Sequence, residues 1–322
     1  MSRITRRAVV AGAVLAPFAA RAQTWPSGPI RIIVPYPAGG SVDAMARLAQ
    51  AGLQQRLGTT IVVDNRSGAS GSTGTVTVAK SPPDGNTWLL VFDNHGVNPA
   101  LLPNYPLDHE KDLAPVSLIG TAPYMVATSP SKPYKNLADV IAAAKKTPGK
   151  LSYGSVGSGS IGHLAMTLLG KQAGVDITHV PYRGGGPAVN DALAGHIDLV
   201  NGSAALMTPH VAAGRLRPVW QHGSKRLAAH PTVPTVREGG YPAAEANAWW
   251  GLYAPAKTPP AIIDRFRTAF IESLRDPNAS KVLTESQQMT LLFSTPQELR
   301  QFEQEQSRMW SQVIRENNIK GD

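Results

Sequence analysis

Two glycine- and serine-rich turns are the parts of this sequence best suited to bind a ligand. The first is YPAGGSVD at residues 36–43, and the second is SVGSGSIGH at residues 155–163. Each turn follows a predicted strand and opens a predicted helix, so each presents backbone N–H groups and hydroxyls at a helix N-terminus. A helix N-terminus carries a partial positive charge that attracts anions. Together the two turns predict a site that holds one carboxylate between them.

The candidate ligand-binding residues of the first turn lie at the end of the strand or at the start of the helix. They are Tyr36, Ala38, Gly39, Gly40, Ser41 and Asp43. Two adjacent glycines let the backbone approach a ligand closely, and Ser41 is a predicted helix cap. Asp43 suits the helix dipole but repels an anion, unless its side chain turns aside or accepts a hydrogen bond from a ligand amine. A tight turn that binds no ligand is the alternative interpretation.

The candidates of the second turn are its three serines, two of its glycines and the histidine that follows. They are Ser155, Gly157, Ser158, Gly159, Ser160 and His163. Residues 157–162 also match the G-x-G-x-x-G dinucleotide fingerprint. That fingerprint needs an acidic residue near the end of the next strand, where this chain has Arg183, a possible partner for a 2′-phosphate. The serines fit a carboxylate better, so we expect no cofactor.

Three further polar residues follow predicted strands, at the edge where ligands gather in open α/β sheets. His95 follows the third predicted strand, and Asn201 and Ser203 follow a strand of the second half of the chain. We expect all three to face the pocket. His163 could donate a hydrogen bond to a ligand carboxylate, or it could cap or pack against its helix.

Several kinds of chemistry lack their residues in this chain. Cysteine is absent, which excludes thiol catalysis, disulfides and cysteine-based metal sites. No Gly-x-Ser-x-Gly or His-Glu-x-x-His motif occurs, and the eight histidines are scattered without metal-ligand spacing. We therefore predict a protein that is not an enzyme and has no metal site. The rival interpretation is an exported hydrolase or isomerase that uses His95 or His163 as its base.

The charged residues do not indicate a nucleic-acid partner. The net charge of +9 is spread along the chain without a basic run or interleaved aromatic residues. Part of that charge lies at the N-terminus, where Arg3, Arg6 and Arg7 precede an apolar run and a small-residue ending at Ala22. This order predicts a signal peptide over residues 1–22 and a periplasmic protein. The twin-arginine and general secretion routes both remain open, and an uncleaved membrane anchor is the alternative.

After residue 23, short apolar strands alternate with helical stretches, which predicts an α/β fold of mainly parallel sheets flanked by helices. The predicted strands are 30–34, 60–63, 88–92, 116–119, 124–128, 151–153, 175–182, 197–200, 216–221 and 249–254. The predicted helices are 42–57, 74–80, 137–146, 161–173, 186–194, 208–213, 259–274, 277–285 and 296–317. The chain crosses to a second set of elements near 120–123 and returns near 246–249. We expect one domain from 23–121 with 247–322, a second from 122–246, and a ligand cleft between them.

At this point the chain resembles the Bug-type extracytoplasmic solute receptors, the binding-protein component of tripartite tricarboxylate transport. Nine motifs in the order of that family carry the resemblance over essentially the whole mature chain. They are YPAGGSVD (36–43) with Arg47, VDNRSGASG (63–71), PDG (83–85), LAPV (113–116), PGK (148–150), HVPYRG (179–184), PHVAAG (209–214), PTVPT (231–235) and WGLYAP (250–255).

The resemblance implies a type II-like periplasmic binding fold of two domains that closes on a small carboxylated ligand. In that fold the turns at 38–43 and 155–160 act as pincers, partly through bridging waters. The implied partner is a tripartite tricarboxylate-type permease or, alternatively, a signalling protein, with the receptor itself a monomer. The chain departs from the family pattern at residues 93–95 and after residue 200. These departures leave the ligand open between a dicarboxylate, an amino acid and an aromatic acid such as nicotinate.

Overall fold

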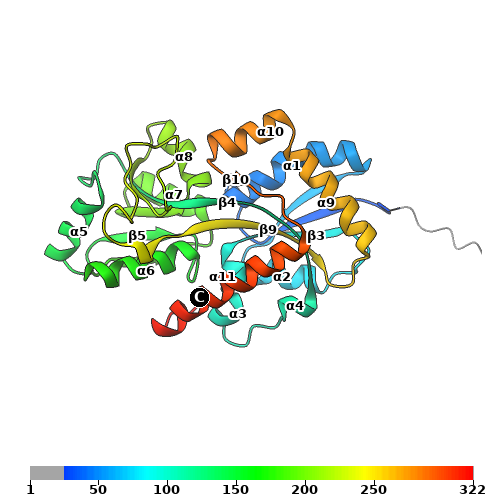
Figure 1. The fold of residues 1–322 in the computed structure, drawn as a ribbon, viewed down its shortest axis with the longest axis horizontal. Helices are drawn as coiled ribbons and strands as arrows, with labels where there is room; N and C mark the ends of the chain where they lie inside the picture. Colours follow the sequence, from blue (N-terminus) through cyan, green and yellow to red (C-terminus); the bar gives the residue numbers. More distant parts are fainter. Residues whose placement is uncertain (1–24, 322) are drawn as a thin grey trace, which may run out of the picture.

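The computed structural model describes residues 25–321 and shows a curved mixed sheet with helices packed around it (Figure 1). The predicted signal peptide lies outside the described residues. The strands are β1 (Ile30–Val34), β2 (Ile61–Asn65), β3 (Thr87–Phe92), β4 (Leu113–Thr128), β5 (Ser152–Ser155), β6 (Thr178–Pro181), β7 (Leu199–Ser203), β8 (Arg217–Gln221), β9 (Asn247–Pro255) and β10 (Thr290–Leu291).

The α-helices are α1 (Ser41–Leu57), α2 (Ser72–Ala79), α3 (Asn98–Leu101), α4 (His109–Asp112), α5 (Leu137–Lys146), α6 (Ile161–Ala173), α7 (Gly185–Ala194), α8 (Ala204–Ala212), α9 (Pro260–Leu274), α10 (Pro277–Lys281) and α11 (Pro296–Glu316). The described residues also form four short helical turns: η1 (Ala69–Gly71), η2 (Asp93–Val97), η3 (Pro242–Ala244) and the π turn η4 (Val282–Ser286). Within residues 25–321, no helix combines the length and the apolar character needed to cross a membrane.

The sheet consists of two parallel parts joined by antiparallel strands. Its order is β2-β1-β3-β9-β4-β7-β5-β6, with β10 and β8 also paired to β4. Strands β1 to β3 are parallel, and so are β5 to β7, whereas β4 and β9 run antiparallel to their neighbours. We call the part around β1–β3 the first half and the part around β5–β7 the second half. The two halves lie side by side, with β4 running through both (Figure 1).

Strand β4 corrects the prediction of two separate strands at 116–119 and 124–128. It is one strand of 16 residues. Gly120 and Pro123 bound the gap between the two predicted strands, but both lie inside β4, opposite Trp250 and Asn247 of β9. Two register shifts within the β4–β9 pair absorb the irregular residues, as β-bulges do. The short elements α3, α4 and β10 were not predicted. Other differences are in length: β6 is shorter than the predicted strand 175–182, and α8 begins before residue 208.

Each half has its own apolar core. In the first half the indole of Trp88 stacks on Phe266 of α9, with ring centroids 3.8 Å apart. In the second half Trp220 and Tyr153 are among the buried side chains. Ile161, at the start of α6, belongs to the first core although its helix lies in the second half. The start of α6 therefore packs the two halves together.

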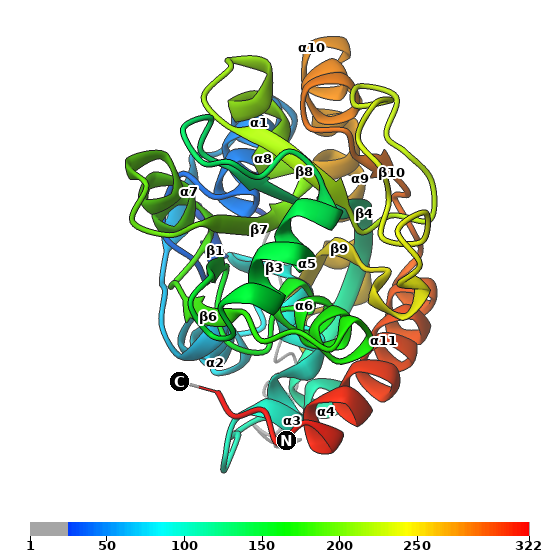
Figure 2. The ribbon, with the colours of Figure 1, turned by 90° about the vertical axis from the view of Figure 1, so that its left-hand side faces the viewer.

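The C-terminal helix α11 runs along one side of the molecule (Figure 2). Thr295 and Glu298 form a capping box at its N-terminus, and Pro296 occupies its first turn. The buried face includes Trp310, whereas Met309 is 49% exposed. This face packs α11 against β4 and the η2 turn, so the end of the chain is bound to the first half.

His222 predicts a specific pH dependence of stability. The side chain is buried between β8 and η3, where its Nδ1–H donates to the carbonyl of Ala244 at 2.7 Å and its Nε2 accepts from Trp220 Nε1–H at 3.1 Å. Burial lowers the pKa of His222 to about 4, although the bond to Ala244 opposes this shift. The unfolded chain protonates this histidine near its ordinary pKa of 6.5. Below pH 6.5 the unfolded state therefore binds more protons, and stability falls as the pH falls towards 4, by up to about 1.4 kcal/mol per pH unit.

Replacing His222 by asparagine should flatten this dependence. Urea unfolding at pH 7.5 and pH 5 measures it: the wild type should lose more free energy of unfolding between the two pH values than His222→Asn. His196 offers a matched control, because its side chain is 70% exposed. His196→Asn should keep the wild-type pH dependence. An equal pH dependence in His222→Asn and the wild type would contradict the assignment.

Candidate functional site

A cavity of about 380 Å³ lies where the two halves meet. Tyr36, Asn94 and the loop 68–71 line it from the first half. From the second half it is lined by Val156, Gly157, Pro181, Tyr182 and Arg183. The cavity volume is in the range of small-molecule sites. Its walls combine backbone-rich turns with one cationic side chain, which is the composition expected for an anionic ligand.

The first turn adjoins this cavity through a small neighbouring pocket. That pocket, of about 20 Å³, is lined by Gly40, Ser41, Ser203 and residues of the α7 start. Tyr36 and Val156 line both spaces. The predicted turns of the two halves therefore border two neighbouring spaces, and they do not contribute in the same way.

The first turn is held by Asp43. Gly40 is the residue that caps α1, and Ser41 is already helical, so the predicted cap is displaced by one residue. The Asp43 carboxylate accepts from Gly39 N–H at 3.0 Å and pairs with Arg47 at 3.0 Å. Burial opposes ionisation of Asp43, but these bonds outweigh it and hold its pKa below the usual value. Asp43 thus turns aside from the pocket and shapes the turn.

Tyr36 and Asn94 form the polar floor of the cavity. The Tyr36 hydroxyl donates to Asn94 Oδ1 at 2.5 Å and accepts from Phe92 N–H at 3.1 Å. Asn94 Nδ2 donates to the carbonyl of Ser70 at 2.6 Å and so positions the loop 68–71. Burial raises the pKa of Tyr36, which keeps its hydroxyl neutral. In this loop Ser70 has a φ of 51°, a left-handed conformation that costs energy in a non-glycine residue and is common at functional sites.

The serines of the second turn mostly bond within that turn. Ser155 Oγ contacts His179 Nε2 at 2.7 Å and accepts from Gly157 N–H at 3.2 Å. Ser160 caps α6: its hydroxyl accepts from His163 N–H at 3.3 Å and donates to the carbonyl of Gly157 at 2.9 Å. The carbonyl of Ser158 accepts from the Ser70 hydroxyl at 3.4 Å, a contact between the halves. Of this turn, Gly157 is the candidate that lines the cavity.

Comparison of the sequence with known proteins identifies the family. The family model described as "Tripartite tricarboxylate transporter family receptor" matches residues 45–319. Protein BugT of Bordetella pertussis is 38% identical over 306 residues, which cover 93% of this chain and 92% of BugT. The chain belongs to the tripartite tricarboxylate transporter receptor family. The resemblance found in the sequence motifs is thereby confirmed.

Several solved structures have the same fold as this receptor. A protein of R. palustris solved with adipate is 31% identical with a TM-score of 0.86, covering 92% of this chain and 99% of its own. MatC from Rhodopseudomonas palustris, solved with bound malate, is 28% identical with a TM-score of 0.83, covering 90% of this chain and all of its own. The periplasmic binding protein BugD is similar to the same degree, with a TM-score of 0.87. The predicted two-domain periplasmic binding fold is confirmed, with a sheet that is mixed in each half.

Several predicted site residues of the receptor lie away from the cavity. His163 lines a different space beside α6 and stacks on His179, with ring centroids 3.8 Å apart. Its Nδ1 accepts from Gly159 N–H at 3.0 Å, which favours the capping and packing interpretation. Asn201 is buried and donates to the carbonyl of Gly162 at 2.8 Å, so it supports the first turn of α6. Ala38 does not line the cavity either.

His95 was predicted to face the ligand pocket, but the structure places it elsewhere. It is 1% exposed and does not line the cavity, although its neighbour Asn94 does. The η2 turn directs these consecutive side chains to different sides, because consecutive residues of a helical turn do not share a face. His95 instead faces His109 and Glu303 of α11.

The cavity also contains residues that the site prediction omitted. These are the loop 68–71, Asn94, Val156 and the segment 181–183. Two of the sequence motifs used for the family resemblance cover most of them, VDNRSGASG at 63–71 and HVPYRG at 179–184. Gly68 and Gly71 in the first motif and Gly184 in the second are a usable signal, since close backbone approach is a frequent reason for glycine near a ligand. From the sequence alone, the role indicated for Arg183 is contact with a nucleotide phosphate.

Proposed function

We propose that this receptor binds a small organic acid with two carboxylates in the cavity between its halves. The observation that carries the proposal is Arg183, the one charged side chain among the described residues that line the cavity. The other residues that line the cavity are polar or apolar, and none is acidic. A cationic residue at the border of a cavity without acidic groups provides a binding position for an anionic group of the ligand.

The two carboxylates would occupy opposite ends of the cavity. The guanidinium of Arg183 matches the planar geometry of one carboxylate and can donate two parallel hydrogen bonds to it. The other carboxylate would lie near Gly157 and the loop 68–71, above the floor formed by Tyr36 and Asn94. There the Ser70 hydroxyl would exchange its 3.4 Å bond to the Ser158 carbonyl for a bond to the ligand. The adipate and malate in the two solved relatives are diacids of suitable size.

Ligand binding would bring the domains together. We assign the domains as 23–121 with 247–322 and as 122–246, because the pairing of β4 changes from β9 to β7 and β8 near Tyr124. A ligand that contacts both domains favours the arrangement in which they touch, by its difference in affinity for the two arrangements. The closed receptor would then deliver its ligand in the periplasm to a tripartite tricarboxylate-type permease. Export would use residues 1–22.

Arg183→Gln tests the proposal directly. Titration calorimetry with adipate and with malate should show affinity lowered about tenfold or more, because a charge-assisted hydrogen bond to a carboxylate is replaced by a neutral one. The matched control is Arg215→Gln, which removes the same charge from an exposed position outside the cavity. It should bind as the wild type does. If no dicarboxylate binds the wild type, or if both variants bind equally well, the proposal fails.

A further inference from the structure

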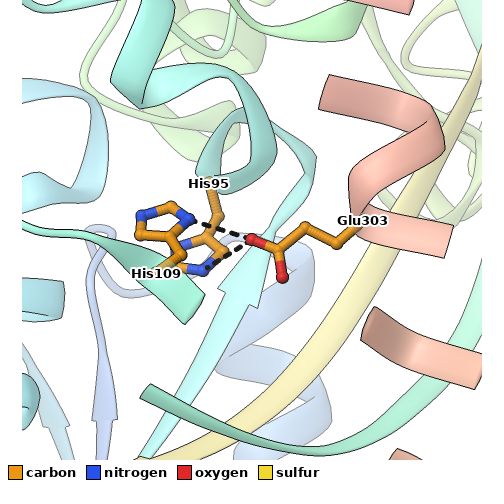
Figure 3. A group of neighbouring side chains, drawn as sticks. All are labelled: His95, His109 and Glu303. Atoms are coloured by element: carbon orange, nitrogen blue, oxygen red, sulfur yellow. Dashed lines mark hydrogen bonds and ion pairs between the residues drawn. The ribbon is translucent and has the colours of Figure 1, made fainter. Parts of the chain in front are cut away.

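Two histidines and a glutamate meet in the interior of the first half, away from the carboxylate cavity. Figure 3 shows the nitrogens of His95 and His109 directed at the same oxygen of Glu303. His95 Nε2 lies 3.5 Å and His109 Nδ1 lies 2.9 Å from Glu303 Oε1. One ligand atom from each of the three residues lies within 4.8 Å of the others, and all three residues are buried. Three distant segments supply them: η2, α4 and α11.

The side chain of His95 is the unexplained part of this cluster. It is 1% exposed, and neither of its ring nitrogens has a hydrogen-bond partner among residues 25–321. A buried polar group without a partner loses its hydration without compensation. The ring is nevertheless turned so that Nε2 points at a carboxylate oxygen (Figure 3). A cation bound by Nε2 and by Glu303 would give this nitrogen the partner that it lacks.

We propose that His95, His109 and Glu303 bind one Zn²⁺ ion. Two imidazoles and one carboxylate are a common set of three protein ligands for zinc, with a water as the fourth. Tetrahedral bonds of 2.0–2.2 Å place ligand atoms about 3.3–3.6 Å apart. The 3.5 Å between His95 Nε2 and Glu303 Oε1 fits this spacing, whereas the 2.9 Å hydrogen bond from His109 Nδ1 would lengthen to admit the ion. The rings of His95 and His109 lie parallel with centroids 4.0 Å apart, so one ring turns about its Cβ–Cγ bond for both nitrogens to bind the ion.

Neighbouring hydroxyls orient the ligands of this zinc site. Tyr105 Oη lies 2.8 Å from His109 Nε2, the nitrogen that does not face Glu303. The hydroxyl of Tyr253 donates to Glu303 Oε2 at 2.9 Å, which leaves Oε1 for the ion. Such outer contacts are typical of metal sites because they fix the orientation of the ligands. A cavity of about 570 Å³ bordered by His109 and Glu303 gives the ion access from solvent.

The zinc would fasten α11 to the turn that carries Asn94. His95 follows Asn94 directly, and Asn94 belongs to the floor of the carboxylate cavity. Glu303 comes from the C-terminal helix, so the ion would link the end of the chain to the site region without touching the ligand. The dispersed positions of these residues explain why the sequence predicted no metal site.

Titration of metal-free protein with Zn²⁺ and Co²⁺ tests the site. The protein is purified from the periplasm without a histidine tag and treated with a chelator. Calorimetry should give one Zn²⁺ per chain, and Co²⁺ should produce a saturable visible absorption band of a tetrahedral complex. Glu303→Gln keeps the shape of the side chain and the hydrogen bond from Tyr253, but should weaken Zn²⁺ binding about 100-fold or more.

The matched control is another histidine–carboxylate pair. Nδ1 of His196 lies 3.3 Å from Oδ1 of Asp191 on the surface. His196→Gln should leave the stoichiometry and the affinity of Zn²⁺ binding unchanged. The wild-type Co²⁺ spectrum decides the question even if Glu303→Gln fails to fold. No saturable band in the wild type, or Zn²⁺ binding that Glu303→Gln leaves intact, would overturn the zinc site. The carboxylate proposal is unaffected by either result, because it rests on Arg183.

Discussion

Replacing Trp88 with alanine is expected to destabilise the receptor by about 3–5 kcal/mol. The indole is fully buried on β3, stacks on Phe266 and contacts Trp25 edge-on, with ring centroids 6.4 Å apart. Its Nε1–H donates to the carbonyl of Gly85 at 2.7 Å. The truncation therefore creates a cavity, removes an aromatic stack and leaves a buried carbonyl without its donor. The midpoint of urea unfolding should fall, with little change in its slope.

A surface truncation and a conservative variant separate this effect from loss of apolar area in general. Met309 is 49% exposed, so Met309→Ala should change the free energy of unfolding by about 0.5 kcal/mol or less. Trp88→Phe keeps an aromatic ring over Phe266 and should lose less than Trp88→Ala. Equal stability of Trp88→Ala and the wild type would mean that the core of the first half does not depend on this stack.

Elements with clear local boundaries were predictable from the sequence. The prediction of a strand at 30–34 and a helix at 161–173 matches β1 and α6. Glycines that close helices give a strong signal, because a left-handed residue ends a helix and glycine adopts that conformation without strain. Gly58 and Gly174 do so with φ of 65° and 62°. These boundaries depend on only a few neighbouring residues, which the sequence shows directly.

Strand β4 was not predictable in the same way. Gly120 and Pro123 look like interruptions within a window of a few residues. What keeps the strand continuous is pairing with β9, whose residues lie more than 120 positions later in the chain. Tertiary pairing of this kind overrides local preference. The sequence therefore indicates where the chain crosses between halves, but not that a single strand makes the crossing.

In the candidate site too, features set by neighbouring residues were predictable and features set by the fold were not. Glycine-rich turns were recognisable, and Tyr36 and Gly157 do line the cavity. The direction of each serine hydroxyl was not recognisable, because Ser155 and Ser160 both find a partner within their own turn, at Gly157. Local hydrogen bonds of this type are frequent for serine near a helix start.

Groupings of distant residues were the least predictable part of the site. Arg183 reaches the cavity only through the fold, and His109 and Glu303 are 194 residues apart in the sequence. No spacing in the sequence reveals such groupings. The packing of complete elements creates them, as when α11 lies against η2.

Gly184→Ala is expected to weaken dicarboxylate binding about 30-fold while leaving the melting temperature of the ligand-free receptor nearly unchanged. Gly184 directly precedes α7 in the second half and lies against the ring of Pro37, which belongs to the first turn. A Cβ at position 184 would lie 2.9 Å from Pro37 Cδ, closer than real Cβ atoms normally come. The proline ring cannot rotate away, so the two halves must separate slightly. Overpacking of this kind costs about 2 kcal/mol, or about 30-fold in affinity.

The clash acts only when the halves touch, which is why affinity and stability should respond differently. Gly186 provides the matched control at the same helix start, because its Cβ would meet the carbonyl oxygen of Ala38 at an ordinary 3.5 Å. Gly186→Ala should therefore bind within about twofold of the wild type. Calorimetry with adipate and thermal unfolding without ligand measure the two quantities. Suppose instead that Gly184→Ala lowers the stability of the free receptor by the same free energy that it removes from ligand binding. The halves would then be joined already without ligand, and ligand binding would not close them.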